Sequence, residues 1–458
     1  MRADHTEVIE RTTHGSQQEL VKEGNKLRRE DRSAHDWYRF VLSYPPHLVR
    51  DYLGKFGLGP EHCVLDPFCG TGTTLVECKK RGVLSIGIEA NPVMAFASRV
   101  KVDWGVDGRG LQQHAEKIAR LALQKLENQG MDDGIDLPLF SKPRTNNQKL
   151  RTLPPESLKL LLKDSISPAP LHKCLVLLET LEKNGDKQFD SHERLAFARA
   201  LVGEISNLEF GPEVGVGPAK ADAPVVSSWL RNVRAMVEDL HCLASMNATP
   251  VKIYEADSRQ LRNLVKPNSV DGVITSPPYP NEKDYTRATR LESVMLRFVE
   301  DKQGLRRLKG RMLRSNTRGV YKSDTDDRFV ENHAEIQRIA DAIEKRRIEL
   351  GKTSGFERLY ARVTKLYFGG LARHLSDLRT ALRPGAQCAY VVGDQASYLR
   401  VMIRTGQLLA DIAQSLGYEV LGIDLFRTRL ATATREQLRE EVVVLRWPGF
   451  GRGKKCLS

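Results

Sequence analysis

The sequence predicts an α/β fold built on a mainly parallel sheet. The stretch CVLDPFCGTGTTLVECKKRG (63–82) reads as a strand, a tight glycine turn and a helix that ends at Gly82. The apolar run VLSIGIE (83–89) follows as a second strand, which completes a β–turn–α–β unit. Toward the C-terminus a strand (385–394), a helix (401–417) and two further strands (418–429 and 440–447) extend the same alternation.

Length and charge set the class of protein. The 458 residues exceed the usual size of one domain, so one large decorated domain or two domains are expected. A formal net charge of +13 and a pI near 9.3 favour a polyanionic partner such as nucleic acid. No run approaches the roughly 18 apolar residues of a membrane span, and the start has no apolar core of a secretory signal. Seven cysteines without a C-x-x-C pair indicate reduced thiols in the cytoplasm, with neither a zinc site nor a disulfide framework.

The glycine turn after the first strand suits a ligand that carries a ribose. Gly70 and Gly72 allow the backbone to pass close to a ligand, and Glu89 lies near the position expected of an acid that binds ribose hydroxyls. Leu75 stands where the third glycine of a G-x-G-x-x-G motif would be, which argues against a pyrophosphate-bearing cofactor. A ribose with an amino-acid carboxylate fits better, and this combination indicates S-adenosylmethionine.

A second strand ends in an unusual way. The apolar stretch SVDGVI (269–274) runs directly into TSPPY (275–279), where two consecutive prolines replace the usual turn residues. Each proline fixes its own φ and pushes the preceding residue into extended geometry. Rigid backbone at the carboxyl end of a strand is typical of a site that must hold polar groups in place.

These two motifs resemble those of the DNA amino-methyltransferases. DPFCGTGTT resembles their cofactor motif, D-P-F-x-G-x-G-T-T, and TSPPY resembles their catalytic motif in the form most typical of the cytosine-N4-specific members. The resemblance implies a Rossmann-type S-adenosylmethionine-dependent methyltransferase with a mainly parallel sheet, a C-terminal antiparallel strand pair and a helical insertion. The cofactor motif precedes the catalytic motif, which excludes the family's permuted arrangement.

The resemblance also implies roles for individual residues in cofactor binding. Glu89 would bind the ribose, and Asp257, in the stretch YEADSRQL (254–261), would reach the adenine amino group. Phe40 and Tyr44 would face the sulfonium as cation–π partners. The residues around the methionine end would be Asp66, Phe68, Gly70, Thr71, Gly72 and Thr73.

The chemistry implied for TSPPY is direct methylation of an exocyclic amine. The Ser276 hydroxyl and a backbone carbonyl of Ser276 or Pro277 would accept the two N–H bonds of the amine, which localises its lone pair. Pro277 and Pro278 supply rigidity, and Tyr279 offers a face on which a flipped base stacks. Methylation at cytosine C5 needs a thiolate, but no Pro-Cys dipeptide occurs and Cys69 reads as a small buried residue.

The remaining segments predict how the chain is organised. A dense basic run between 302 and 322 contains no acid and favours phosphate contact. Its residues named as DNA contacts are Arg306, Arg307, Lys309, Arg311 and Arg314. The expected divisions are a polar tail (1–34), the cofactor-binding half (35–106), a mainly helical insertion (107–225), the catalytic half (226–286), a basic DNA-contacting region (287–354) and the C-terminal part of the sheet (355–458).

The expectation is therefore a site-specific DNA methyltransferase that acts on cytosine N4 in restriction–modification or host DNA protection. S-adenosylmethionine is the expected cofactor, without a metal, and double-stranded DNA and a cognate restriction endonuclease are the expected partners. The protein is expected in the cytoplasm, associated with the nucleoid through DNA. Adenine-N6 methylation of DNA, exocyclic-amine methylation of RNA and a nucleic-acid-binding module without catalysis stay open as alternatives. The sequence does not decide whether 107–225 or 287–354 reads the target.

Overall fold

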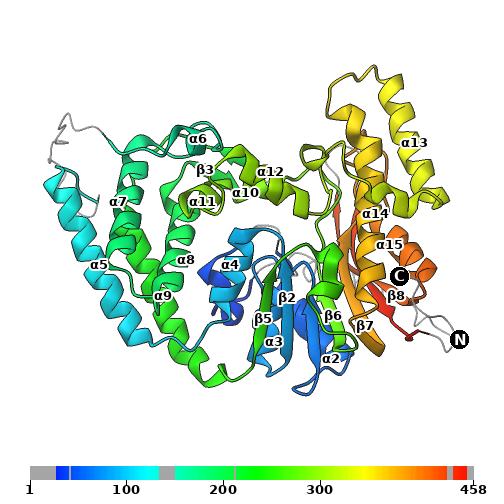
Figure 1. Cartoon of the computed structure of the whole chain (residues 1–458), viewed down its shortest axis with the longest axis horizontal. Coiled ribbons are helices and arrows are strands. Elements are labelled where there is room, and N and C mark those ends of the chain that lie inside the picture. Colours follow the sequence, from blue (N-terminus) through cyan, green and yellow to red (C-terminus); the bar gives the residue numbers. More distant parts are fainter. Residues whose placement is uncertain (1–26, 41–42, 134–149, 211–212, 431–436, 451–458) are drawn as a thin grey trace, which may run out of the picture.

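The fold is centred on a seven-stranded sheet with the order β5-β2-β1-β6-β7-β9-β8 (Figure 1). The computed structural model describes residues 27–40, 43–133, 150–210, 213–430 and 437–450. Every neighbouring pair from β5 to β7 is parallel, and β9 runs antiparallel to both β7 and β8. The strands are β1 (Cys63–Asp66), β2 (Leu84–Glu89), β5 (Val251–Glu255), β6 (Val270–Thr275), β7 (Leu382–Gly393), β8 (Glu419–Leu430) and β9 (Gln437–Arg446).

Helices cover both faces of this sheet. Successive strand residues point to opposite faces, so Val64 packs with α2 (Pro46–Lys55) while Leu65 packs with α14 (Tyr360–Leu378). α13 (Ala334–Glu349) packs on the outer side of α14. The other helices next to the sheet are α3 (Thr73–Lys80), α4 (Pro92–Lys101) and α15 (Thr405–Ser415). The predicted mainly parallel sheet with an antiparallel pair at its C-terminal end is confirmed.

The segment between β2 and β5 is mostly helical and lies to one side of the sheet (Figure 1). It contains α5 (Gly108–Asn128), α6 (Pro155–Leu158), α7 (Pro168–Asn184), α8 (Asp190–Ala200) and α9 (Val225–Leu243). The mainly helical character expected of 107–225 is interrupted by one hairpin, formed by β3 (Leu208–Phe210) and β4 (Val214–Val216).

Three helices come next after β6: α10 (Tyr285–Ala288), α11 (Arg290–Met295) and α12 (Lys302–Arg311). Figure 1 shows them above the carboxyl ends of the strands, between the helical segment and α14. Most of the expected polar tail (1–34) lies outside the described residues. Within the described ranges no helix is long and apolar enough to cross a membrane.

Candidate active site

The principal cavity opens where the strand order reverses. β1 lies between β2, its successor in the chain, and β6, so the carboxyl ends of β1 and β6 diverge into a crevice that commonly binds ligands in open α/β sheets. The cavity measures about 260 Å³ and is lined by residues that follow β1, β2, β5 and β6. We call it the central cavity.

The glycine turn forms one wall of this cavity. Gly70 and Gly72 have φ values of 51° and 85°, a region that side chains rarely adopt. A Cβ on Gly72 would also lie 3.1 Å from the Ser98 hydroxyl oxygen, which itself donates a 2.7 Å hydrogen bond to the Gly70 carbonyl. The backbone conformation therefore favours glycine at both positions, and the contact with Ser98 adds a steric requirement at Gly72. Leu75, at the missing third glycine, packs over Gly87, where a Cβ would lie only 2.6 Å from its side chain.

Glu89 lines the cavity at the end of β2. Its carboxylate accepts hydrogen bonds from the backbone N–H groups of Gly70 (2.9 Å) and Asn91 (2.7 Å). Burial raises the pKa of Glu89 to about 7, because the charged form loses hydration. The carboxylate is thus held rigidly at the glycine turn and keeps lone pairs for a hydroxyl-bearing ligand.

Asp66, at the end of β1, lies behind the cavity rather than in its wall. Its carboxylate accepts hydrogen bonds from the Thr275 hydroxyl (2.6 Å), the Tyr44 hydroxyl (3.0 Å) and the Phe68 amide (3.1 Å). Burial raises its pKa to about 6. Asp66 therefore ties together three segments: the strand that leads into TSPPY, the turn after β1 and the segment that carries Tyr44.

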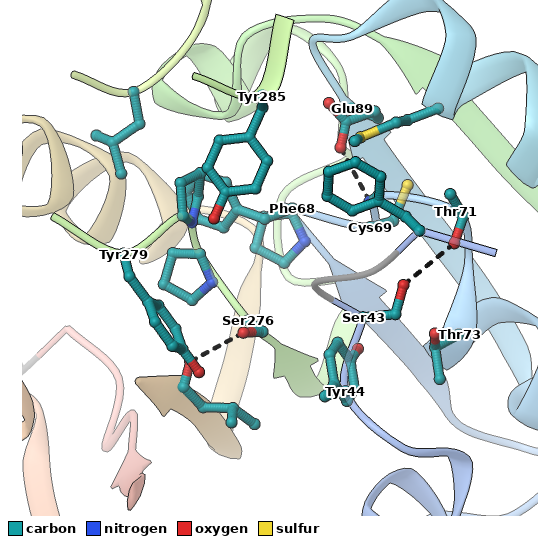
Figure 2. A pocket seen from close by; sticks show the side chains of 18 of the residues that line it. Ser43, Tyr44, Phe68, Cys69, Thr71, Thr73, Glu89, Ser276, Tyr279 and Tyr285 are labelled. Atoms are coloured by element: carbon teal, nitrogen blue, oxygen red, sulfur yellow. Dashed lines mark hydrogen bonds between the residues drawn. The ribbon is translucent and has the colours of Figure 1, made fainter. Parts of the chain in front are cut away.

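TSPPY forms the opposite wall. Figure 2 shows Ser276 and Tyr279 on one side of the cavity and Glu89 on the other. The Ser276 hydroxyl donates a 3.1 Å hydrogen bond to the Val391 carbonyl of β7 and lies next to the Tyr279 hydroxyl, so its hydrogen is engaged and its oxygen can accept. The Tyr279 ring packs against Gly393, where a Cβ would lie 3.0 Å from it.

Aromatic rings line much of the remaining surface (Figure 2). Phe68 makes an edge contact with His374, with ring centroids 4.9 Å apart, and Phe40 and Tyr285 lie 5.9 Å apart. Burial raises the pKa of Tyr285 to about 12, so its hydroxyl is protonated at neutral pH. The cavity combines flat apolar walls with a few fixed polar groups, as ligand sites generally do.

Most of the residues predicted for the site meet in this one cavity. Those that line it are Tyr44, Phe68, Gly70, Thr71, Thr73, Glu89, Ser276, Pro277, Pro278, Tyr279 and Arg311. Asp66, Gly72 and Asp257 are not among the lining residues. The Asp257 carboxylate caps the short helix that begins at Ser258 and forms an ion pair with Arg259 (2.7 Å). Its contact with an adenine amino group remains a prediction, although Ala256 and Ser258 on either side of it line the cavity.

The basic segment (302–322) differs from its prediction in one respect. It contains no acid itself, but acids from other segments pair with three of its cations. Lys309 binds Asp284 (2.7 Å), Arg311 binds Glu255 (3.3 Å) and Arg314 binds Asp324 (2.7 Å). Arg314 is only 4% exposed, so it is a structural residue and the expectation of a free phosphate contact there is wrong. Arg306 and Arg307 are exposed on α12.

Several residues of the cavity wall were missed by the sequence motifs. They come from the loop after TSPPY and from the two last strands of the sheet: Asn281, Lys283, Tyr285, Phe426, Arg427, Arg429 and Glu440. In the sequence, the only indication was the pair of arginines in FRTR (426–429), which lie two residues apart in a predicted strand. Among the described residues, no group of three or more His, Cys, Asp and Glu side chains is arranged to hold a metal ion.

Comparison with known proteins gives consistent matches. A family model described as DNA methylase matches residues 14–96. The type II methyltransferase M.BsoBI of Geobacillus stearothermophilus is 24% identical, over 96% of this chain and 88% of its own length. The type II methyltransferase M.AvaI of Nostoc sp. is 22% identical, over 91% and 87%. Among solved structures, TrmN from Thermus thermophilus aligns with 91% of this chain and 52% of its own, at 11% identity and a TM-score of 0.29, too low to indicate a shared fold.

Proposed function

Because this chain belongs to the N4/N6 family of DNA methyltransferases, we propose that it methylates the exocyclic N4 amine of cytosine in duplex DNA. The observation that carries the proposal is the geometry of Ser276, whose hydroxyl hydrogen is engaged by Val391 while its lone pairs are left to accept. A cytosine amine has two N–H bonds to donate, and an acceptor at this position matches one of them.

The residues of the central cavity fit S-adenosylmethionine, which supplies an electrophilic methyl group when it is bound. Glu89 offers carboxylate lone pairs to ribose hydroxyls, and the glycine turn allows close approach of a ligand. Phe40, Tyr44 and Phe68 provide aromatic surface for a sulfonium. Tyr44 is fixed by its hydrogen bond to Asp66, so Asp66 acts through Tyr44 and the backbone rather than by direct contact.

The chain's own residues then promote the reaction by positioning. Ser276 and the backbone carbonyl of Ser276 or Pro277 accept the two N–H bonds of the amine and localise the nitrogen lone pair. Tyr279 presents its ring to the flipped base. The acceptors are held by two prolines and by the Ser276–Val391 hydrogen bond, so little reorganisation is needed in the transition state. As the amine nitrogen bonds to the methyl carbon, the carbon–sulfur bond would break with its electron pair left on sulfur, and one amine proton, held by the Ser276 acceptor, would be released to solvent. No covalent enzyme intermediate is required.

DNA recognition is assigned to segments around the cavity. We propose that the exposed arginines of α12 contact phosphates, and that the helical insertion (107–225) or the basic region (287–354) reads the target sequence. The cofactor half (35–106), the catalytic half (226–286) and the C-terminal part (355–458) together form the catalytic unit. The names of the relatives, both type II methyltransferases, support a role in restriction–modification with a cognate endonuclease.

The test is the identity of the modified nucleoside. The purified protein should convert cytosine to N4-methylcytosine in duplex DNA, as measured by mass spectrometry of nucleosides after incubation with S-adenosylmethionine. A product of N6-methyladenine alone would overturn the proposal in favour of adenine, since the same geometry serves both amines. Methylation of RNA alone would assign the site to RNA. Ser276→Ala serves as the control for contaminating activity.

A further inference from the structure

The edge of the central cavity contributed by β8 contains a β-bulge. Phe426 and Arg427 are consecutive, yet both line the cavity, whereas successive residues of a regular strand face opposite sides. The register explains this: Leu425 pairs with Glu441 and Arg427 with Glu440, so Phe426 is the extra residue. Bulges are frequent beside active sites, where they redirect side chains. Here the bulge brings an aromatic ring and a guanidinium to the same cavity.

Arg427 is held at the cavity by an acid from the neighbouring strand. Its Nε donates a 2.6 Å hydrogen bond to a carboxylate oxygen of Glu440, whose side chain is 10% exposed. Glu440 in turn lies beside the catalytic loop. A Cβ on Gly393 would be 3.3 Å from Cγ of Glu440 and 3.0 Å from the Tyr279 ring, so the acid and the ring flank the same glycine.

The ion pair with Glu440 leaves hydrogen-bond donors of Arg427 available to a ligand. Of the guanidinium nitrogens of Arg427, only Nε has a hydrogen-bond partner among the described residues. The two terminal nitrogens therefore remain as donors in a fixed planar arrangement. The second carboxylate oxygen of Glu440 lies 3.8 Å from Nε of Arg429, so the acid is shared by two arginines of the cavity wall and its position is fixed from both sides.

We propose that Arg427, positioned by Glu440, recognises the pyrimidine edge of the flipped base by donating N–H bonds to N3 and O2 of cytosine. The inference rests on the proposed function and adds the residue that selects the base. Beyond its amine, cytosine presents two adjacent acceptors, N3 and O2, whereas adenine presents one acceptor, N1, followed by a C–H. Adenine would leave one buried donor unpaired, and sites built around such hydrogen bonds discriminate strongly.

The experiment combines a protein variant with a base analogue. The target duplex is first mapped by sequencing DNA that the wild-type protein has methylated. Single-turnover rates are then measured with cytosine and with 3-deazacytosine, which has C–H in place of N3, for wild type and Arg427→Gln. We expect Arg427→Gln to slow cytosine methylation about 100-fold or more, and to lose most of the wild type's preference for cytosine over the analogue. The double comparison cancels the analogue's own reactivity.

The control is Arg446→Gln, which removes a similar cross-strand pair, with Glu419, from the same two strands but outside the cavity. Its rates should stay within about twofold of wild type. Arg427→Lys keeps the charge but not the fork, so it should retain the thermal midpoint and lose discrimination, which separates recognition from folding.

Two results would overturn the inference and leave the proposed function intact. One is an unchanged preference for cytosine over its analogue in Arg427→Gln. The other is an equal loss of affinity for every target with a shallower salt dependence, which would make Arg427 a phosphate contact. Formation of N6-methyladenine by the wild-type protein would overturn the proposed function itself.

Discussion

At the scale of single residues, the site depends on groups whose hydrogen bonds are already assigned before any ligand binds. The Ser276 hydroxyl donates to Val391, and the Glu89 carboxylate accepts from two backbone amides. The serine oxygen and the ionised form of the carboxylate therefore offer a ligand lone pairs from fixed positions. One prediction concerns Ser276 on one side of the cavity, and another concerns Glu89 on the opposite side.

Ser276→Ala should slow methyl transfer and leave cofactor binding close to normal. The lost lone pairs act mainly in the transition state, and removal of one such contact typically costs about 10²–10³ in rate. Single-turnover kinetics measure the rate, and isothermal titration measures cofactor affinity. Wild-type rates in this variant would show that the hydroxyl does not accept from the amine, so that the backbone carbonyl and the prolines act alone.

Cofactor affinity should rise between pH 6 and pH 8. Ribose hydroxyls donate to ionised Glu89, whose pKa burial raises to about 7, so the acceptor form is the minority at pH 6 and the majority at pH 8. Binding near pH 6.5 should release a proton, which titration calorimetry in buffers of different ionisation enthalpy detects. Glu89→Gln should bind weakly and lose most of this pH dependence. An equally steep profile in that variant would assign the effect to Asp66, whose pKa lies near 6.

At the scale of elements, the basic segment (302–322) shows how far a charge run can be interpreted from sequence. The run of cations was visible, but their partners come from Glu255, Asp284 and Asp324, which lie up to 56 residues away in the chain. Only tertiary structure brings such pairs together. The exposed Arg306 and Arg307 remain the candidates for DNA contact.

Arg306→Gln combined with Arg307→Gln should weaken DNA binding and make the affinity less dependent on salt. With fewer phosphate contacts, fewer counterions are released when DNA binds. Fluorescence anisotropy across a salt series measures both, and cofactor affinity should not change. The matched control is Arg338→Gln with Arg346→Gln on the exposed face of α13. Unchanged DNA affinity and salt slope in the α12 variant would make these arginines ordinary surface residues.

Arg314→Gln should instead reduce stability. The change leaves the half-buried Asp324 with only the Tyr321 amide as a donor among the described residues, and loss of one member of a buried ion pair costs about 3–5 kcal/mol. Chemical denaturation of Arg314→Gln and of the Arg306→Gln/Arg307→Gln variant compares their free energies of unfolding directly. If Arg314→Gln unfolds at the wild-type denaturant concentration, its pairing with Asp324 contributes little.

The elements that carry motifs were predictable, and those that depend on register were not. The strand and helix around DPFCGTGTT follow from local pattern, and β1 and α3 lie where the pattern placed them. The bulge at Phe426 depends on how β8 aligns with β9, which no local pattern contains. The ion pair between the Asp257 carboxylate and Arg259 was not predicted either, and Asp257 is not among the residues that line the cavity.

At the scale of the whole molecule, the helical insertion and the catalytic sheet share one core. A single buried cluster contains Leu75 and Val93 from the cofactor half together with residues of α5, α7, α8 and α9. The segment at 34–38 adds polar links, because Asp239 of α9 accepts from the Ala34 amide (3.0 Å) and the Trp37 indole (2.7 Å). The helical segment between β2 and β5 thus shares a buried core with the helices next to the sheet, rather than forming a separate body on a linker.

Asp239→Ala should therefore affect both stability and cofactor binding. Two N–H donors lose their acceptor, which costs about 1–3 kcal/mol for each buried group left unpaired. The same segment leads to Phe40 and Tyr44 in the cavity wall, so cofactor affinity should fall as well. Thermal unfolding and isothermal titration measure the two effects. A lower thermal midpoint with unchanged affinity would separate the segment's fold from the cofactor site.

The position of β9 has a consequence for biosynthesis. β9 is translated after every other strand of the described sheet, yet it inserts between β7 and β8 and carries Glu440. During synthesis, the glycine turn and TSPPY are made before β9, whereas the cavity wall that contains Glu440 cannot assemble until β9 has been made. A chain that stops before β9 therefore contains both sequence motifs but lacks one wall of the central cavity.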